Sequence, residues 1–329
     1  MPDPVSELPV SEPAVPELSP GLARAAGLAA GFAADRLLGD PRRWHPVAGF
    51  GVLAAGLERR VYTDRRTRGV LHVAVLVGGA AALGEAAERL TARRPLLRAF
   101  VTALATWAVL GGRSLEREAL AVHRHVAEAD LAAARRRLTH LVGRDTAALP
   151  ESEIARAAVE SVAENTSDAV VAPLAWGALA GVPGLLAYRA ANTLDAMTGH
   201  HSARYERFGW AAARLDDLLN LPGSRLAGLL TAACAPAAAR ETLAAWRRDA
   251  RRHPSPNAGV VEAAFAGALG IRLGGSNVYG GRVEHRAVLG GGRAAAPADI
   301  TRAVRLARRV GAAAALVSAL LAAARSPRR

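Results

Sequence analysis

The chain has 329 residues, of which 51% are hydrophobic and 22% charged, and its formal net charge is +13. All 42 basic residues are arginines, and the absence of lysine excludes a P-loop ATPase and a pyridoxal-phosphate enzyme, because both need a lysine. No basic helix with interleaved aromatic residues and no zinc-finger spacing occurs, so no nucleic-acid partner is expected. Arginines beside apolar segments indicate instead a membrane protein that faces anionic lipid or an anionic substrate.

The N-terminal region divides into a tail and the start of a folded domain. Residues 1–20 are rich in Pro and Glu and have neither a basic start nor a long apolar core, so we expect a disordered tail rather than a signal peptide. Residues 21–329 are expected to form a single helical membrane enzyme domain. The apolar segment 21–34 leads into a loop that carries Asp35, Asp40 and His45. Each of these could take part in chemistry, but taken singly each is more simply a turn former or a helix cap.

Two apolar segments follow, at residues 69–84 and 99–112. Both are shorter than the ~20 residues that a perpendicular membrane span needs, so they could span only if flanking arginines snorkel. Pro95 separates them, which predicts a helical hairpin. The next segment, residues 113–150, is polar and helical in pattern, and its excess of arginine assigns it to the cytoplasmic side.

The most informative stretch is residues 158–168, which precedes a long apolar run. If it is helical, Glu160, Glu164 and Asp168 recur every fourth residue and share one face, with Asn165 at its edge. Like charges at this spacing repel, so the face needs cationic partners or a metal ion. A solvated acidic face is the simpler alternative, but an amide, two hydroxyls and an acid cluster at the apolar boundary, which favours a functional site.

The apolar run at residues 169–188 has about the length of one membrane span. Proline and glycine interrupt it at residues 181–184, so a re-entrant helical hairpin is the other possibility, and we favour it slightly. The choice matters because Asn192 and Asp195 follow the run. A straight span would place them on the opposite membrane face from Asp168, whereas a hairpin would bring them back to it.

The C-terminal half carries further candidates. Asp216 and Asp217, followed by Asn220, offer oxygen ligands at a spacing that suits Mg²⁺, although Arg214 could simply pair with Asp217. Two prolines fix the shape of the loop that holds His253 and Asn257. The glycine-rich loop 270–281 has backbone N–H groups that could approach an anion.

The chain closes with a basic helix that enters the apolar run 310–324, a plausible last membrane helix. Strand-type alternation is nearly absent along the sequence. The predicted fold is therefore all-α, a polytopic helical membrane protein with a polar site facing the cytoplasm.

These motifs together resemble the CobD/CbiB family of cobalamin biosynthesis, the adenosylcobinamide-phosphate synthases. Eight segments occur in family order and cover roughly residues 30–290: 35–47, 112–115, 142–146, 160–173, 192–197, 213–217, 253–259 and 270–281. The resemblance implies a multi-pass enzyme of the inner membrane that uses ATP to join (R)-1-aminopropan-2-ol, or its O-phosphate, to the free propionate of adenosylcobyric acid. It also implies a corrinoid as substrate, contact with the lipid bilayer, and other membrane enzymes of the pathway as possible partners.

The resemblance supplies the motif positions, and the chemistry suggests their roles. A carboxylate condenses with an amine only after activation, which calls for ATP, Mg²⁺ and groups that stabilise developing charge. We expect catalytic roles for Glu160, Glu164, Asp168 and His253, and metal binding by Asp216 and Asp217. The expected substrate-binding residues are Asp40, His45, Arg144, Asn165, Asn192, Asp195, Arg214, Asn257, Gly274, Gly275 and Asn277. A membrane transporter or a corrinoid-binding scaffold without catalysis is the alternative, because buried carboxylates beside membrane helices are also typical of carriers.

Overall fold

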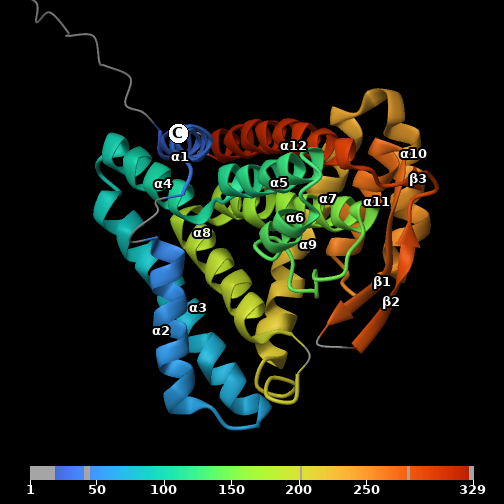
Figure 1. Ribbon diagram of the computed structural model, residues 1–329. Helices are drawn as coiled ribbons and strands as arrows, with labels where there is room; N and C mark the ends of the chain where they lie inside the picture. The colour runs from blue at the N-terminus through green and yellow to red at the C-terminus, as the bar shows by residue number, and fades with distance from the viewer. Residues whose placement is uncertain (1–18, 41–44, 201, 280–281, 326–329) are drawn as a thin grey trace, which may run out of the picture.

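The structure is a computed structural model that describes residues 19–40, 45–200, 202–279 and 282–325 (Figure 1). The predicted tail covers residues 1–20, of which 1–18 lie outside the described residues; the last two form the start of the first helix, which begins at Pro20 and is capped by the Ser19 side chain. The longer helices are α1 (Pro20–Leu38), α2 (Pro46–Val61), α3 (Arg66–Thr91), α4 (Pro95–Val109), α5 (Gly112–Ala127), α6 (Leu131–Leu138), α7 (Glu151–Thr166), α8 (Ala172–Thr198), α9 (Trp210–Cys234), α10 (Ala239–Asp249), α11 (Ala258–Leu269) and α12 (Pro297–Ala324).

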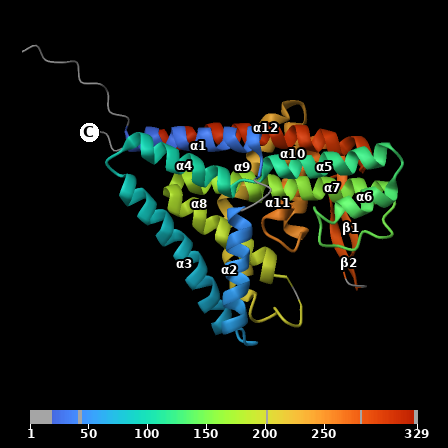
Figure 2. The same cartoon turned by 60° about the vertical axis from the view of Figure 1, so that its left-hand side comes forward.

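The helices form two groups that meet at one end. In Figures 1 and 2, α1, α4, α5, α7 and α12 run along one another, while α2, α3 and the second half of α8 descend from them at an angle. The larger apolar core lies in the first group and in α11, around buried residues such as Leu28, Val159 and Phe265. A smaller core, which includes Leu76 and Leu194, joins α2 and α3 to α8 and α9.

Helix α8 contains the turn that decides the topology. Gly181 has φ +65° and ψ −148°, which breaks the helix, and Pro183 follows. The Tyr188 hydroxyl donates to the Asp168 carbonyl at 3.0 Å, although 20 residues separate the two and a straight helix would hold them about 30 Å apart. The chain therefore folds back on itself, and the re-entrant hairpin is confirmed over the straight span.

Glu88 of α3 holds this turn. Its carboxylate accepts from the Val182 N–H at 3.0 Å and from Arg98 at 2.7 Å, with Arg24 at 3.4 Å. The Val182 N–H lies at the start of the returning half of α8, where a helix has no acceptor of its own for its first N–H groups, so Glu88 acts as its cap. This contact has no local signal in the sequence, because Glu88 is 94 residues away in the chain.

By length and composition, four helical segments of the described residues could cross a membrane: Arg66–Thr91, Pro95–Ala127, Glu151–Thr198 and Pro297–Ala324. The chain is a polytopic helical membrane protein. The break at Pro95 was predicted correctly, but the predicted hairpin of α3 and α4 was wrong, since α4 packs along α1 and α3 along α8. Gly27 and Gly31 explain the α1–α4 contact: a Cβ on either would lie within 2.5 Å of a threonine Cβ of α4.

A small sheet was not predicted. It comprises β1 (Ile271–Tyr279), β2 (Arg282–Leu289) and β3 (Arg293–Ala294), with β1 antiparallel to β2 and parallel to β3. The glycine-rich segment that was expected to be a loop is therefore a strand, and the mostly helical fold carries one minor sheet. Gly270, with φ +66°, ends α11 in the left-handed conformation and directs the chain into β1.

Candidate active site

The acidic stretch lies where the two helix groups converge. It is helical as predicted, but α7 ends at Thr166 and a π-helical turn, Ser167–Val171, carries Asp168. Such turns are frequent at functional sites. Glu160 is buried, Glu164 is exposed to solvent and Asp168 is partly buried, so the shared face runs from the protein interior to the solvent-exposed surface, and we call this face the acidic site.

The returning half of α8 and helix α9 bring further polar groups to the acidic site. Asn192 donates to Asp216 Oδ1 at 3.2 Å, and Asn220 donates to Asp216 Oδ2 at 2.9 Å. Tyr188 in turn donates to Asn220 Oδ1 at 2.7 Å. Asn192 and Asp216, 24 residues apart, thus meet because α8 folds back. The hairpin places Asp195 within electrostatic reach of both Asp168 and Asp216.

Three aspartates of the acidic site, Asp168, Asp195 and Asp216, have no cationic partner at close range in the described part of the chain. Burial raises the pKa of Asp216 from 3.8 to about 6, against the amide hydrogen bonds of Asn192 and Asn220, which lower it. Among the described residues, no arginine lies within 4 Å of the carboxylate of Asp168, Asp195 or Asp216. These three carboxylates therefore favour a nearby cation, either a metal ion or an ammonium group.

The expected metal pair is split between two environments. Asp216 is buried, whereas Asp217 is half-buried and faces Arg214 at 3.7 Å, so the local pairing considered for Arg214 is present. No three His, Cys, Asp or Glu side chains in the described part of the chain are grouped so as to enclose a metal ion. This donor set still fits Mg²⁺, which takes one or two carboxylates and fills its remaining positions with water and phosphate oxygens.

Glu160 is the centre of a buried ionic cluster. It accepts from Arg144 at 2.5 Å, from Arg156 at 2.8 Å and from the Gly274 N–H at 2.8 Å. Asn277 Oδ1 accepts from the same two arginines, at 2.7 and 3.0 Å. These contacts tie α7 to β1 and to the loop before α7. They indicate that the cluster formed by Glu160, Arg144, Gly274 and Asn277 holds α7 and β1 in place.

Arg156 belongs to this cluster but was not among the predicted site residues. The signal was present, because Arg156 and Glu160 are four residues apart on one helix. Gly275 neighbours Gly274 in β1, with φ +104°. Asn165 lies at the edge of α7, half-buried, and its amide donates back to the Ser161 carbonyl at 3.0 Å.

His253 and Glu262 form a second polar pair. Nδ1 of His253 accepts from the Ser255 N–H at 3.1 Å, and Nε2 lies 3.7 Å from Glu262 Oε1. Burial raises the pKa of Glu262 well above its usual value and lowers the pKa of His253, so both tend to be uncharged. Glu262 was not among the predicted site residues, although it follows the prolines that shape the His253 loop within a few residues.

Asn257 holds the loop that carries His253 in place. Its side chain accepts from Ser224 at 2.8 Å and from Arg225 at 2.7 Å, and it donates to the Asp217 carbonyl at 2.8 Å. All three partners belong to α9. These bonds fix the His253 loop against the helix that carries the two aspartates.

The N-terminal candidates lie around the start of α2. His45 caps this helix by accepting from the Val47 N–H at 3.1 Å, and its Nε2 is 3.8 Å from Asp40, so the interpretation of His45 as a helix cap is confirmed. Asp35 is buried and accepts from the Arg113 N–H, and burial raises its pKa to about 6. Asp40 and Asp168 both attract Arg189 electrostatically, which connects this region to the acidic site.

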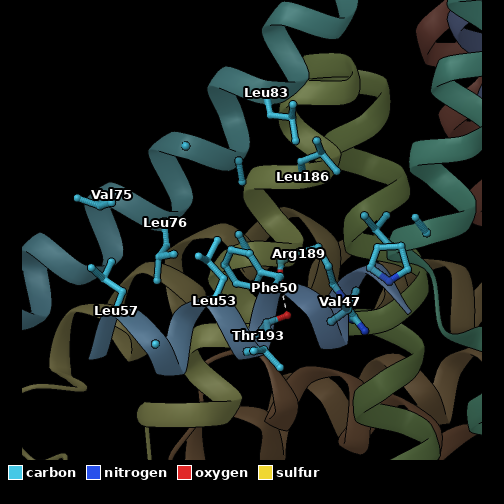
Figure 3. Close-up of a pocket in the computed structure, with 18 of the residues that line it drawn as sticks. Val47, Phe50, Leu53, Leu57, Val75, Leu76, Leu83, Leu186, Arg189 and Thr193 are labelled. Carbon is cyan, nitrogen blue, oxygen red and sulfur yellow. Dashed lines mark hydrogen bonds between the residues drawn. The ribbon is translucent and has the colours of Figure 1, made fainter. Parts of the chain in front are cut away.

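The other face of the returning helix borders an apolar cavity of about 960 Å³ between α2, α3 and α8. Figure 3 shows Phe50 and Leu53 of α2 facing Leu76 of α3 across it, with Arg189 and Thr193 of α8 on its wall. The same helix thus presents amide and acid groups to one side, and Leu186, Arg189, Ala190 and Thr193 to the apolar cavity on the other.

The fold and the site define a helical membrane protein with a buried ionic cluster and an acidic group that reaches the solvent-exposed surface. A family model described as "CobD/Cbib protein" matches residues 28–307, and the chain belongs to this CobD/CbiB family. Proteins named "Cobalamin biosynthesis protein CobD" are similar to it. One from Mycobacterium tuberculosis is 52% identical over 307 residues, 92% of this chain and 97% of that protein.

Two more distant relatives carry the same name. The protein from Geobacter metallireducens is 48% identical over 265 residues, 78% of this chain and 83% of that protein. A protein from Rhodobacter capsulatus is 43% identical over 298 residues, 88% of this chain and 94% of that protein. No solved structure matches the chain. The family resemblance inferred from the sequence motifs is confirmed.

Proposed function

We propose that this protein is an ATP-dependent acid–amine ligase of cobalamin biosynthesis. It joins (R)-1-aminopropan-2-ol or its O-phosphate to the free propionate of adenosylcobyric acid, and it does so as a multi-pass protein of the cytoplasmic membrane whose acidic site faces the cytoplasm. The names of its relatives support the pathway. The observation that supports the chemistry is the group of Asp168, Asp195 and Asp216, whose charges no arginine of the described chain neutralises at close range.

The proposed reaction has two steps. A propionate oxygen attacks the γ-phosphorus of ATP, which releases ADP and gives an acyl phosphate. The amine then attacks the acyl carbon, phosphate leaves, and the nitrogen loses a proton. Mg²⁺, when bound by Asp216 and Asp217, would neutralise phosphate charge.

The residues of the chain have distinct parts in this proposal. Glu164 and Asp168 attract the substrate ammonium to the acidic site, because their carboxylates lie on its accessible face. Glu262, whose raised pKa makes its carboxylate form a stronger base, accepts beside His253 the proton that the amine must lose before or during its attack. The Glu160 cluster acts indirectly, by holding α7 and β1 in register.

The test uses detergent-purified protein with adenosylcobyric acid, aminopropanol or its phosphate, and Mg–ATP. We expect an amide product in equal amount to ADP, and we expect Glu164→Gln to abolish it. Glu153→Gln is the matched control, because Glu153 lies on the same helix and is partly exposed in its first turn. A wild-type protein that binds the corrinoid but makes no amide with ATP would instead be a transporter or a binding scaffold.

A further inference from the structure

A second cavity, distinct from the acidic site, lies between α9, α10 and the loop that carries His253. Its volume is about 670 Å³, and its lining includes three arginines, Arg225, Arg247 and Arg251. Trp246 and His253 also contribute to its walls. None of these three arginines was among the predicted site residues.

Two arginines of the cavity differ from their neighbours in the chain by having no acidic partner among the described residues. Arg248 and Arg252 both pair with Asp249, at 2.7 and 3.8 Å. In contrast, among the residues that the structure describes, no carboxylate lies within 4 Å of Arg247 or Arg251. The alternation along the chain therefore separates structural arginines from arginines that face the cavity.

The third arginine is held by neutral groups. Arg225 donates to Asn257 Oδ1 at 2.7 Å and to the Ser224 hydroxyl at 2.9 Å, so its position is fixed while these bonds leave its charge uncancelled. Three like charges around one cavity repel one another, and an anion with several negative charges relieves that repulsion. Guanidinium groups bind phosphate oxygens in a bidentate manner, which makes phosphate the best match.

An aromatic surface adjoins these charges. Trp246 is half-buried, and its ring lies close against Gly228 of α9, where a Cβ would come within 2.8 Å of the ring. This contact fixes the plane of the indole beside the cavity. A fixed indole next to guanidinium groups suits a ligand that has both a flat ring system and phosphates.

Two residues connect the cavity to the neighbouring polar groups. His253 lines the cavity, yet its Nε2 faces Glu262 at 3.7 Å. Asn257, which holds Arg225, also donates to the carbonyl of Asp217. Asn257 thus links the arginine end of the cavity to the part of α9 that carries Asp217.

We propose that the basic cavity of Arg225, Arg247 and Arg251 binds the phosphate chain of a nucleoside triphosphate, with the base beside Trp246. This assignment rests on the proposed ligase function and names where its nucleotide binds. It differs from a site in which the whole nucleotide lies over the acidic stretch of α7. The terminal phosphate alone reaches the aspartates.

The test compares the double variant Arg247→Gln/Arg251→Gln with Arg252→Gln, in which the adjacent arginine that pairs with Asp249 is changed. The probe is a fluorescent ATP analogue, bound to purified protein in nanodiscs of zwitterionic lipid. We expect the dissociation constant of the analogue to be at least tenfold higher in the double variant than in the wild type, and to change less than twofold in the control. Size-exclusion elution and the thermal midpoint verify that both variants are folded.

Competition then identifies the source of the phosphate. We expect ATP and inorganic triphosphate to displace the analogue, and anionic phosphatidylglycerol in the nanodisc to leave binding unchanged. Displacement by the lipid but not by triphosphate would show a headgroup site and overturn the proposal. Unchanged analogue binding in the double variant, or no binding by the wild type, would overturn it as well.

The amide assay keeps the two proposals apart. A wild type that makes amide while the double variant binds nucleotide normally leaves the ligase correct and the cavity assignment wrong. A wild type that binds nucleotide through these arginines but makes no amide leaves the cavity correct and the ligase wrong.

Discussion

The Glu160 cluster allows a sharp test of whether a carboxylate in the family motif acts chemically or structurally. In Glu160→Gln, the buried arginines Arg144 and Arg156 lose the anion that they share at 2.5 and 2.8 Å. Removing one partner of a buried ion pair costs about 3–5 kcal/mol, because it leaves uncompensated charge. Glu153 still accepts from Arg156, so we expect the low end, about 3 kcal/mol. At roughly 2 °C per kcal/mol for a chain of this size, the thermal midpoint should fall by on the order of 6 °C.

The assay is thermal unfolding in detergent, followed with a thiol-reactive dye. Cys234 is the only cysteine of the chain and is partly buried, so its reactivity reports unfolding. Glu153→Gln is the control: its side chain is 36% exposed, and we expect a loss below about 1 kcal/mol. A Glu160→Gln protein that melts like the wild type but has no ligase activity would refute the structural reasoning and give Glu160 a chemical role.

Three other changes probe the turn and two buried acids. Gly181→Ala places a Cβ on a residue with φ +65° and only 1.9 Å from the Glu88 carboxylate, so we expect a lower thermal midpoint. The control is Gly78→Ala, which should be neutral or stabilising because nothing lies within 4 Å of the added Cβ. The raised pKa of Glu262 means that the folded state holds its proton more tightly than the unfolded state, so ionisation of Glu262 destabilises the fold as the pH rises. Glu262→Gln cannot ionise, so we expect its thermal midpoint to rise relative to that of the wild type between about pH 5 and 9. The pKa of Asp249 is lowered, so its ionised form stabilises the fold at pH values above the ordinary carboxylate pKa. Asp249→Asn should therefore cost about 1.5–3 kcal/mol of unfolding free energy at neutral pH. In acid, where wild-type Asp249 is protonated, the difference in thermal midpoint should disappear.

Most of the fold could be predicted because its signals are local. Apolar runs, proline breaks and the carboxylate spacing in α7 depend on neighbours in the chain, and the structure places helices there. The turn at Gly181 could also be recognised, since glycine and proline act within a few residues. The sheet was missed because β1 has four polar or glycine residues in its centre and is stabilised by pairing with β2, which no local pattern announces.

The candidate site was predictable in composition but not in partnership. The motif residues Asp168, Asn192 and Asp216 do meet, and only the back-folding of α8 makes that possible. The contacts that define roles are long-range: Glu160 with Gly274 is 114 residues apart, and Arg144 with Asn277 is 133. Sequence reasoning could therefore choose the residues, while their division into structural and accessible groups required the three-dimensional arrangement.

The cap on the α8 turn has a consequence for how the protein is made. Glu88 and its partners Arg24 and Arg98 all precede residue 100, so the acceptor for the Val182 N–H exists before the hairpin has been synthesised. Because chains fold from the N-terminus during synthesis, α1, α3 and α4 can enter the membrane first and form a socket. The later hairpin then inserts its turn into that socket, where an uncapped N–H would otherwise meet lipid. The order in which the chain is synthesised thus matches the order in which these helices can assemble in the membrane.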